Sequence, residues 1–295
     1  MTRGVDGPVA VLGLGAMGAG LAGRLLDQGI PVRVWNRTAD RTAPLAEAGA
    51  HVATHPADAV TGTSAVICVV SDGEALGTVL RGPDGVLAEG PYPGVVLCAS
   101  TVAPEEVVQI AGDIPQILDM GMLGNRDHAR DGELRLFVGG EQEAVKAALP
   151  LLRTLGKEVV HLGALGSGMR MKLLLNLLMG IEVQALAEAT ELASACGLDR
   201  QQVLKTIAGS GFASPVMAFK SRRLASARFD EPDFRLRLMA KDLMLATKQA
   251  AAVGLSLPLA TAAAETHVRA TEQGLGDQDC AAVTRALAPK PGTDT

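Results

Sequence analysis

The sequence predicts an α/β fold in which a doubly wound parallel sheet fills the first half of the chain and an all-α domain the second. Up to about residue 163, short apolar runs of strand length alternate with amphipathic stretches of helix length, the order that parallel βαβ units produce. From Gly166 onward the strand-like runs stop and long helix-forming runs follow. The length of 295 residues suits two domains. We therefore expect one domain over residues 1–164 and another over residues 165–295, joined by a long helix.

Each element is expected from its apolar pattern and from the residues that bound it. The expected strands are Val9–Leu12, Val32–Trp35, Ala65–Val70, Gly94–Cys98, Ile117–Met120, Leu134–Val138 and Val159–His161. Helical patterns in the first half include Met17–Gln28 and Glu141–Leu155. The helices of the second half are expected over Ser167–Cys196, Asp199–Ile207, Pro215–Ala227, Arg237–Val253 and Pro258–Gly274, and several of these end at or just before a glycine.

Charge and composition exclude several classes of partner. A net charge of −5, from 27 basic and 32 acidic residues, offers no basic stripe for nucleic acid and no polybasic segment for a membrane surface. The most apolar run, Met169–Val183, contains Arg170, Lys172 and Glu182, which are costly in a bilayer, so we interpret it as a buried helix.

The cysteine pattern and the amino-terminal sequence indicate a cytoplasmic protein. The four cysteines are far apart and form no CxxC pair, so neither a disulfide framework nor a metal site is expected. The first eight residues are short, polar and glycine-containing, unlike a signal peptide.

A glycine-rich motif follows the first expected strand and opens the first expected helix. Gly13, Gly15 and Gly18 stand at GxGxxG spacing in a strand–turn–helix context. Gly13 permits the tight turn, Gly15 lets the backbone approach a pyrophosphate, and Gly18 lets the helix pack on the strand. The alternative is a glycine-rich turn without a ligand. We favour a Rossmann-type dinucleotide site.

The residues after the second expected strand favour NADP(H) over NAD(H). An NAD-dependent enzyme places an acidic residue here to hold the ribose 2′-hydroxyl. This chain has Asn36, Arg37 and Thr38 instead, and a guanidinium group pairs well with a 2′-phosphate. The alternative is that Arg37 is a solvated loop arginine.

A lysine at the start of the long helix is a candidate general acid/base. Lys172 and Asn176 are four residues apart and share one helix face among apolar neighbours. Burial would lower the pKa of this lysine and ease proton transfer near neutral pH. A snorkelling lysine is the structural alternative.

At this point the chain resembles the β-hydroxyacid dehydrogenase family, which includes 3-hydroxyisobutyrate dehydrogenase and glyoxylate reductases. The resemblance extends over nearly the whole chain and rests on separated motifs in the right order. Besides the motifs above, these are Val70-Ser71-Asp72, Ser100-Thr101 to Pro104, the segment from Asp119 to Gly140, Gly166 to Asn176, Phe234, Lys241-Asp242-Leu243 and Gly276 to Asp279.

The resemblance implies a Rossmann domain, a helical domain that forms homodimers, and a hydride transfer between NADP(H) and a small carbonyl or hydroxy substrate. It implies Lys172 as the general acid/base, with Asn176 as its helper. The residues implied at the substrate are Ser100, Thr101, Leu123, Gly124 and Phe234. Those implied at the cofactor are Gly13, Leu14, Gly15, Ala16, Met17, Gly18, Asn36, Arg37, Thr38, Val70, Ser71, Thr101 and Lys241.

One departure from the family pattern concerns the substrate. Leu123 stands where the family usually has a serine that helps to hold the substrate carboxylate, and leucine cannot donate a hydrogen bond. The following Arg126, His128 and Arg130 offer cations for an anionic group, but a charged surface loop is the better explanation for them.

Two other functions fit parts of the sequence. An imine reductase shares the architecture and resembles this chain at Asn36-Arg37-Thr38 and at the apolar Met122-Leu123, but Lys172 stands where imine reductases generally carry Asp or Tyr. A non-catalytic NADP-binding sensor would have no need to keep Lys172, Asn176 and Thr101 together.

Overall fold

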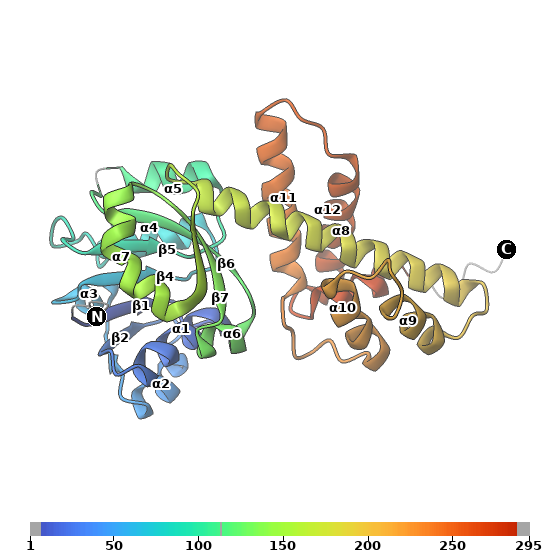
Figure 1. Ribbon diagram of the computed structural model, residues 1–295, viewed down its shortest axis with the longest axis horizontal. Coiled ribbons are helices and arrows are strands. Elements are labelled where there is room, and N and C mark those ends of the chain that lie inside the picture. The colour runs from blue at the N-terminus through green and yellow to red at the C-terminus, as the bar shows by residue number, and fades with distance from the viewer. Residues whose placement is uncertain (1–6, 113, 288–295) are drawn as a thin grey trace. The chain divides into compact units, whose positions relative to one another are not determined.

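The computed structural model describes residues 7–112 and 114–287. It divides into two compact units, Met1–Lys172 and Leu173–Thr295, and the first of these holds a mixed α/β layer structure (Figure 1). The α/β fold with a helical second half is therefore confirmed. The expected domain boundary after residue 164 lies eight residues before the division between the units, because the first turns of the long helix pack within the first unit.

The sheet of the first unit has eight strands among the described residues, in the order β3-β2-β1-β4-β5-β6-β7-β8. The strands are β1 (Val9–Leu12), β2 (Val32–Trp35), β3 (His51–Val52), β4 (Ala65–Cys68), β5 (Val95–Cys98), β6 (Ile117–Leu123), β7 (Leu134–Gly139) and β8 (Gly156–His161). Strands β1 to β6 run parallel, which brings their carboxyl ends to one edge.

The sheet is mostly parallel, and it departs from the expected parallel pairing at its far edge. Strand β7 pairs antiparallel with β6, and β8 pairs parallel with β7. The physical reason is the length of the connection, because residues 124–133 hold only one short helix and cannot form the crossover that a parallel neighbour needs. Strand β6 also extends to Leu123, beyond the expected end at Met120, so this part of the expected substrate loop is a strand.

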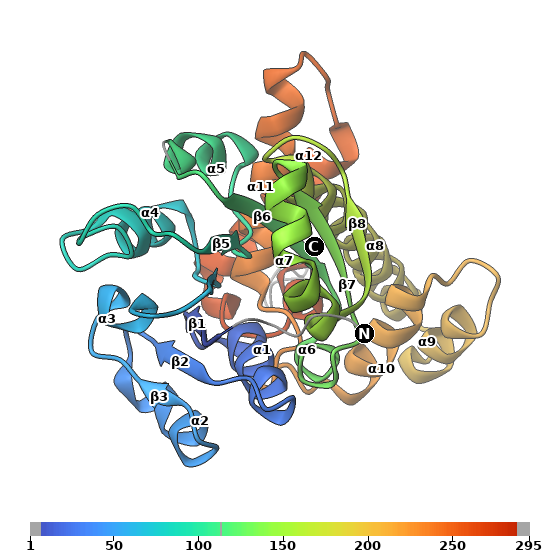
Figure 2. The same cartoon turned by 60° about the vertical axis from the view of Figure 1, so that its left-hand side comes forward.

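Helices cover both faces of the sheet. They are α1 (Ala16–Asp27), the 3-10 turn η1 (Ala39–Thr42), α2 (Ala43–Glu47), α3 (Pro56–Val60), α4 (Gly73–Arg81), α5 (Pro104–Ala111), α6 (Arg126–Asp131) and α7 (Gln142–Leu155). Helices α1 and α7 cover one face, and α3, α4 and α5 cover the other (Figure 2). The buried side chains of each group form a core with the face that they cover. Two apolar faces explain the nearly continuous apolar strands, since a doubly covered sheet is buried on both sides.

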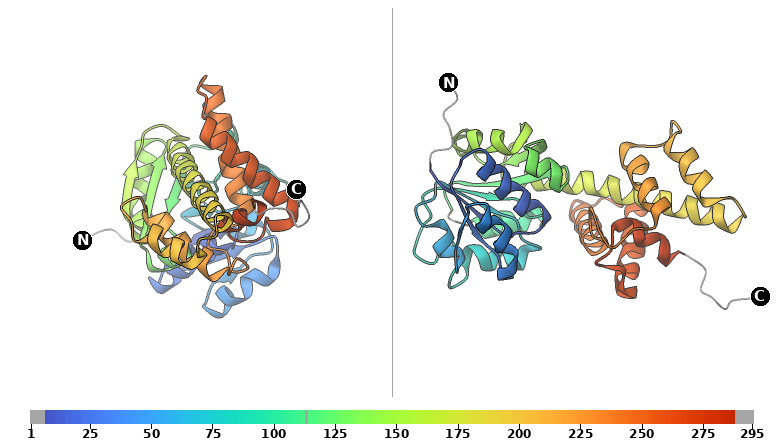
Figure 3. Two further views of the ribbon diagram at one scale, coloured as in Figure 1. Left: turned by 90° about the vertical axis from the view of Figure 1, so that its right-hand side faces the viewer. Right: turned by 90° about the horizontal axis from the view of Figure 1, so that it is seen from below.

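Among its described residues, the second unit has helices joined by loops and no β-strand. Its elements are α8 (Ser167–Ala195), which begins in the first unit, α9 (Arg200–Ala208), α10 (Pro215–Ser226), α11 (Leu236–Ala252), α12 (Pro258–Ala270), the π turn η2 (Thr271–Leu275) and the 3-10 turn η3 (Cys280–Ala286). Helices α11 and α12 pack side by side (Figure 3). Helix α12 ends four residues before the expected end, where the chain continues as a π turn.

Helix α8 is long and apolar enough to cross a membrane by length and composition, with a mean hydropathy of 1.3 in its most apolar stretch. It is the one such helix among the residues that the structure describes. Its side chains Val183, Leu186 and Ala187 belong to the core of the second unit. The helix thus packs as a core helix of this unit.

Candidate active site

The glycine-rich turn between β1 and α1 has the backbone that the motif predicts. Gly13 has φ +97°, and a Cβ atom added there would lie 2.2 Å from the carbonyl oxygen of Val69. A Cβ atom at Gly18 would lie 1.9 Å from the carbonyl oxygen of Gly13. Both positions therefore exclude any side chain. They seat α1 directly against the turn and the end of β4.

Gly15 differs from these two glycines because space is open beside it. A Cβ atom added at Gly15 would have no heavy atom within 4 Å. Helix α1 begins at the next residue with no side chain capping it and no acidic residue in its first turn. Its N–H groups and the positive end of its dipole are thus available to an anion. This cradle fits a dinucleotide pyrophosphate. Of the neighbouring expected residues, Leu14 is buried, Ala16 is exposed and Met17 is half-buried against the core.

Asn36 connects the end of β2 to the glycine-rich turn. Its Oδ1 accepts a hydrogen bond of 2.8 Å from the N–H of Leu14, and its Nδ2 donates one of 2.8 Å to the carbonyl oxygen of Thr38. The side chain therefore fixes the loop that carries Arg37 relative to the turn. Arg37 itself is exposed and forms no ion pair with any residue that the structure describes.

Ser100 holds the ends of β4 and β5 together. Its hydroxyl accepts a hydrogen bond of 2.7 Å from the N–H of Val70 and donates one of 3.2 Å to the carbonyl oxygen of Cys68. The side chain is 1% exposed, so its hydroxyl is committed to backbone partners. The expected substrate contact of Ser100 stays a prediction. Thr101, the next residue, is half-buried at the carboxyl edge of the sheet, and Ser71 is exposed there.

Lys172 lies on the second turn of α8 against the last residues of β6. Its Nζ donates a hydrogen bond of 2.8 Å to the carbonyl oxygen of Met122. The lysine is half-buried, so it is held in place rather than extended into solvent. Leu123, the next residue of β6, is 38% exposed, and Gly124 follows with φ +142°. The strand end thus brings an ammonium group and an apolar side chain to the same edge.

The cations after Gly124 have partners in the first unit. Arg130 donates a hydrogen bond of 2.9 Å to Asp27 of α1, and Asn125 and His128 cap the start of α6 by reciprocal hydrogen bonds. Arg126 is exposed beside Asp127. These contacts account for the charged segment as a surface helix packed on α1.

In the second unit, Asn176 is buried and linked to an aspartate. Its Nδ2 donates a hydrogen bond of 2.5 Å to Oδ2 of Asp242, which is 1% exposed. The Nζ atom of Lys241 lies 2.9 Å from Oδ1 of the same aspartate. The sequence predicts roles for Asn176 and Lys241 but none for Asp242. The only signal for it was its place beside Lys241, since the two helices that meet here are far apart in sequence.

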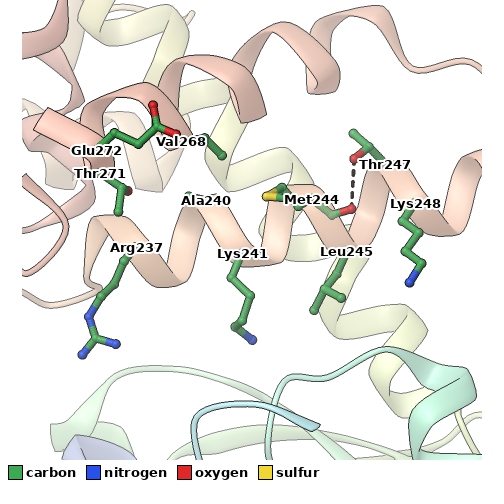
Figure 4. Close-up of a pocket in the computed structure, with 10 residues that line it drawn as sticks. All are labelled: Arg237, Ala240, Lys241, Met244, Leu245, Thr247, Lys248, Val268, Thr271 and Glu272. Carbon is green, nitrogen blue, oxygen red and sulfur yellow. Dashed lines mark hydrogen bonds between the residues drawn. The ribbon is translucent and has the colours of Figure 1, made fainter. Parts of the chain in front are cut away.

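Lys241 also lines an open groove of about 770 Å³ in the second unit. Figure 4 shows Arg237, Lys241 and Lys248 extending from the same side of α11, with Leu245 between the last two. The groove therefore combines cationic and apolar groups, a combination suited to an anion with an apolar portion. Phe234, expected at the substrate, is half-buried before α11, and its carbonyl oxygen accepts a hydrogen bond of 2.8 Å from Cys280.

Two family models match the chain in succession. The model for the NAD binding domain of 6-phosphogluconate dehydrogenase matches residues 8–163, and that for the NAD-binding region of NADP-dependent 3-hydroxyisobutyrate dehydrogenase matches residues 166–287. The chain belongs to the β-hydroxyacid dehydrogenase family, the family of 3-hydroxyisobutyrate dehydrogenase. The expected family is thus confirmed, together with an NAD(P)-binding function.

Curated relatives of this family differ in what they are named for. The chain is 31% identical to glyoxylate/succinic semialdehyde reductase 1 of Arabidopsis thaliana, over 95% of this chain and 98% of that protein. It is 34% identical to the cytokine-like nuclear factor N-PAC of Xenopus tropicalis, over 95% of this chain and 53% of that protein. The chain thus spans about half the length of the N-PAC relatives that it matches.

Solved structures agree with the family. The 3-hydroxyisobutyrate dehydrogenase of Salmonella typhimurium has a TM-score of 0.87 at 25% identity, covering 95% of this chain and 99% of its own. That of Mycobacterium tuberculosis, solved with L-serine, has a TM-score of 0.82 at 27% identity, covering 96% and 99%. An imine reductase from Pseudomonas sp. has a TM-score of 0.63 at 23% identity, covering 96% and 99%, and shares the fold.

Proposed function

We propose that the protein catalyses reversible hydride transfer between NADP(H) and the carbonyl or alcohol carbon of a small substrate, with Lys172 as the general acid/base. The observation that carries this proposal is the fixed position of Lys172. Its Nζ is held 2.8 Å from the Met122 carbonyl oxygen at the edge of the sheet where Thr101 and the glycine-rich turn also lie. A proton donor held at a ligand-binding edge suits general acid/base chemistry.

Each group has one proposed role in hydride transfer, proton transfer or substrate binding. The bound nicotinamide supplies or takes the hydride. During reduction, protonated Lys172 gives a proton to the substrate oxygen, and during oxidation its neutral amine takes the alcohol proton. Thr101 and Gly124 position the substrate, Phe234 contacts it, and Asn176 orients the lysine and the hydroxyl group. Position 123 carries leucine instead of the usual serine, so backbone N–H groups take the place of the serine hydroxyl as hydrogen-bond donors to the substrate.

We assign NADP(H) rather than NAD(H) from the loop after β2. Arg37 is exposed next to the pyrophosphate cradle, and Asn36 ties its loop to that cradle. No acidic side chain occupies the two positions on either side of Arg37. A 2′-phosphate would therefore meet a guanidinium group and the Thr38 hydroxyl, the donors that phosphate oxygens prefer.

We further propose that residues 1–164 hold the cofactor and that residues 165–295 complete the substrate site and form a homodimer. A cytoplasmic location fits the free cysteines, three of which are buried. A net charge of −5 and the core packing of α8 argue against nucleic acid and membrane partners.

The imine reductase alternative rests on Leu123. An exposed leucine at the end of β6, where the family usually places a carboxylate-binding serine, favours a substrate without an acid group. A third possibility, binding without catalysis, matches the relatives that are named as nuclear factors.

One experiment separates these functions. NADPH consumption by the purified protein is measured against semialdehydes, 2-keto acids, hydrophobic aldehydes and cyclic imines, and the oxidation of L-serine and other 3-hydroxy acids is followed with NADP⁺. Turnover of carbonyl or hydroxy acids supports the proposal. Turnover of imines alone establishes the alternative, and NADPH binding with no turnover in the whole panel points to a binding protein.

A further inference from the structure

The residue before helix α8 is Gly166, which has φ +92° and carries no side chain that could cap the first turn. The cap comes instead from Asp119 of β6, whose Oδ1 accepts a hydrogen bond of 2.7 Å from the N–H of Gly166 and whose Oδ2 accepts one of 2.6 Å from that of Met169. A carboxylate at this end also meets the positive end of the helix dipole.

Asp119 is fully buried, so its placement is tightly constrained. Burial raises the pKa of its carboxyl group, and the hydrogen bonds from Met169 and Gly166 oppose that rise. A Cβ atom added at Gly139 of β7 would lie 2.3 Å from Oδ1 of Asp119. The carboxylate therefore fills a space that exists only because its neighbour has no side chain.

Glycines also let the first turn of α8 lie directly on the strand backbone. A Cβ atom added at Gly168 would lie 2.4 Å from the carbonyl oxygen of Phe137 in β7. One added at Gly121 of β6 would lie 2.6 Å from the carbonyl oxygen of Gly168 and 3.1 Å from Cβ of Lys172. The helix thus has no room to move toward the sheet, and the Asp119 carboxylate keeps it from moving away.

Lys172 lies between this anchor and the end of the same strand. Strand β6 holds the helix at Asp119, contacts it at Gly121, and accepts the Lys172 hydrogen bond at Met122. Three residues of one strand therefore determine where the lysine lies. Errors of about 1 Å in the position of a catalytic group can cost about a hundredfold in rate.

We propose that Asp119 is a positioning residue for catalysis, which sets the place of Lys172 by anchoring the first turn of α8 to β6. This inference rests on the proposed function of Lys172. Asp119 itself lies buried behind the site and need not touch the substrate. A purely structural Asp119 would support the stability of the first unit and leave the environment of Lys172 unchanged.

Two variants disturb the anchor in different ways. Asp119→Asn keeps the shape of the side chain but replaces one of its two acceptor oxygens by a donor. Gly121→Ala leaves Asp119 intact and pushes the helix away from the strand through the 2.6 Å contact with Gly168. The matched control is Gly94→Ala, whose added methyl group would meet the Ser64 carbonyl oxygen at 2.4 Å, at the opposite end of β5 from Thr101.

The first readout is turnover. In Asp119→Asn and Gly121→Ala we expect kcat to fall by about a hundredfold while the Kd for NADPH stays within about twofold, because the cofactor turn is untouched. Gly94→Ala should lower Tm and keep kcat. Equal losses of kcat and Tm in all three variants would reduce Asp119 to a structural role.

The second readout does not depend on turnover. Lysines are acylated competitively across a pH series and quantified by mass spectrometry, with exposed Lys146 as the internal reference. The labelling midpoint of Lys172 should move to lower pH in both variants, because the ammonium group loses the Met122 acceptor. An unmoved Lys172 midpoint overturns the inference even if the wild-type protein turns over none of the substrates. Should Asp119→Asn fail to fold, Gly121→Ala decides by the same readouts.

Discussion

Asn176 of α8 donates a hydrogen bond of 2.5 Å from Nδ2 to Oδ2 of Asp242 in α11, and both side chains are buried. An amide has a donor end and an acceptor end, and a carboxylate can only accept. The aspartate therefore decides which way the Asn176 amide faces. The Asn176 Oδ1 is thereby kept as an acceptor that faces away from Asp242.

Replacing Asp242 by asparagine should remove this control. In Asp242→Asn the new amide can donate to Asn176 as well as accept from it, so the Asn176 amide is free to turn over. We expect kcat to fall by at least about tenfold, a fraction of the effect of a general acid/base itself. Glu265→Gln, which removes an exposed charge from the same unit, is the control. Wild-type kcat in Asp242→Asn would show that Asn176 needs no fixed orientation.

Lys172→Ala should abolish most turnover and spare cofactor binding. Loss of a general acid/base costs roughly 10²- to 10⁴-fold in kcat, whereas the pyrophosphate cradle lies on α1 and is unaffected. Lys172→Arg should be nearly as slow, because a guanidinium group keeps its proton at neutral pH. Steady-state kinetics and NADPH titration by fluorescence measure the two effects, with Lys146→Ala as the control. Substantial turnover by Lys172→Ala would remove its catalytic role.

Elements bounded by clear signals could be predicted from the sequence to the residue. The strands Val9–Leu12 and Val32–Trp35 are found as expected. The first is an apolar run, the second alternates buried and half-buried residues, and both lie between proline, glycine or polar residues. Strand β3 was missed, since His51 and Val52 are exposed and form no pattern. The direction of β7 was also missed, because an apolar run has no sign that tells parallel from antiparallel pairing.

In the candidate site, too, local features could be predicted from the sequence and long-range contacts could not. The spacing of Gly13, Gly15 and Gly18 encodes a local backbone shape, so the cradle was predictable. The contact of Asp119 with the helix start was not, because 47 and 50 residues separate it from the two N–H groups it binds. Ser100 belongs to a motif that is visible in the sequence, but its hydrogen bonds to β4 could be seen only in the fold.

Arg37→Ala should weaken NADPH binding far more than NADH binding. The arginine is exposed at the loop after β2, and a charge-assisted contact to a 2′-phosphate is worth about 1.5–3 kcal/mol, or roughly 10- to 150-fold in Kd. NADH lacks the phosphate, so its Kd should stay within about twofold. Calorimetric titration with both cofactors provides the test, and Arg135→Ala on the surface of β7 is the control. Equal losses for the two cofactors would refute the 2′-phosphate assignment.

Alanine substitutions at Gly15 and at Gly18 should have different effects on stability and on cofactor binding. Gly15→Ala adds a methyl group where the protein leaves open space, so Tm should change by no more than about 2 °C. The same methyl group would enter the space of a pyrophosphate, and both NADPH and NADH binding should be lost. Gly18→Ala would place its methyl group 1.9 Å from the Gly13 carbonyl oxygen and should lower Tm sharply. Cofactor binding by a stable Gly15→Ala variant would move the pyrophosphate elsewhere.

His267 should make the protein less stable in mild acid. Its side chain is fully buried in α12, Nδ1 donates a hydrogen bond of 2.9 Å to the Ala263 carbonyl oxygen, and Nε2 has no partner among the described residues. Burial lowers the pKa of His267 to about 4, from 6.5 in the unfolded chain. The unfolded chain therefore takes up the proton first as the pH falls.

The sign of the effect follows from these two pKa values. Above pH 6.5 the histidine is neutral in both states and costs nothing. Between pH 6.5 and about 4, protonation favours the unfolded chain, and the free energy of unfolding should drop by up to about 3 kcal/mol. Urea denaturation at several pH values from 7.5 to 4.5 measures this loss. His267→Leu should show a smaller loss than the wild type over that range, and His51→Asn, an exposed histidine, should match the wild type. Parallel curves for His267→Leu and the wild type would mean that other groups carry the acid sensitivity.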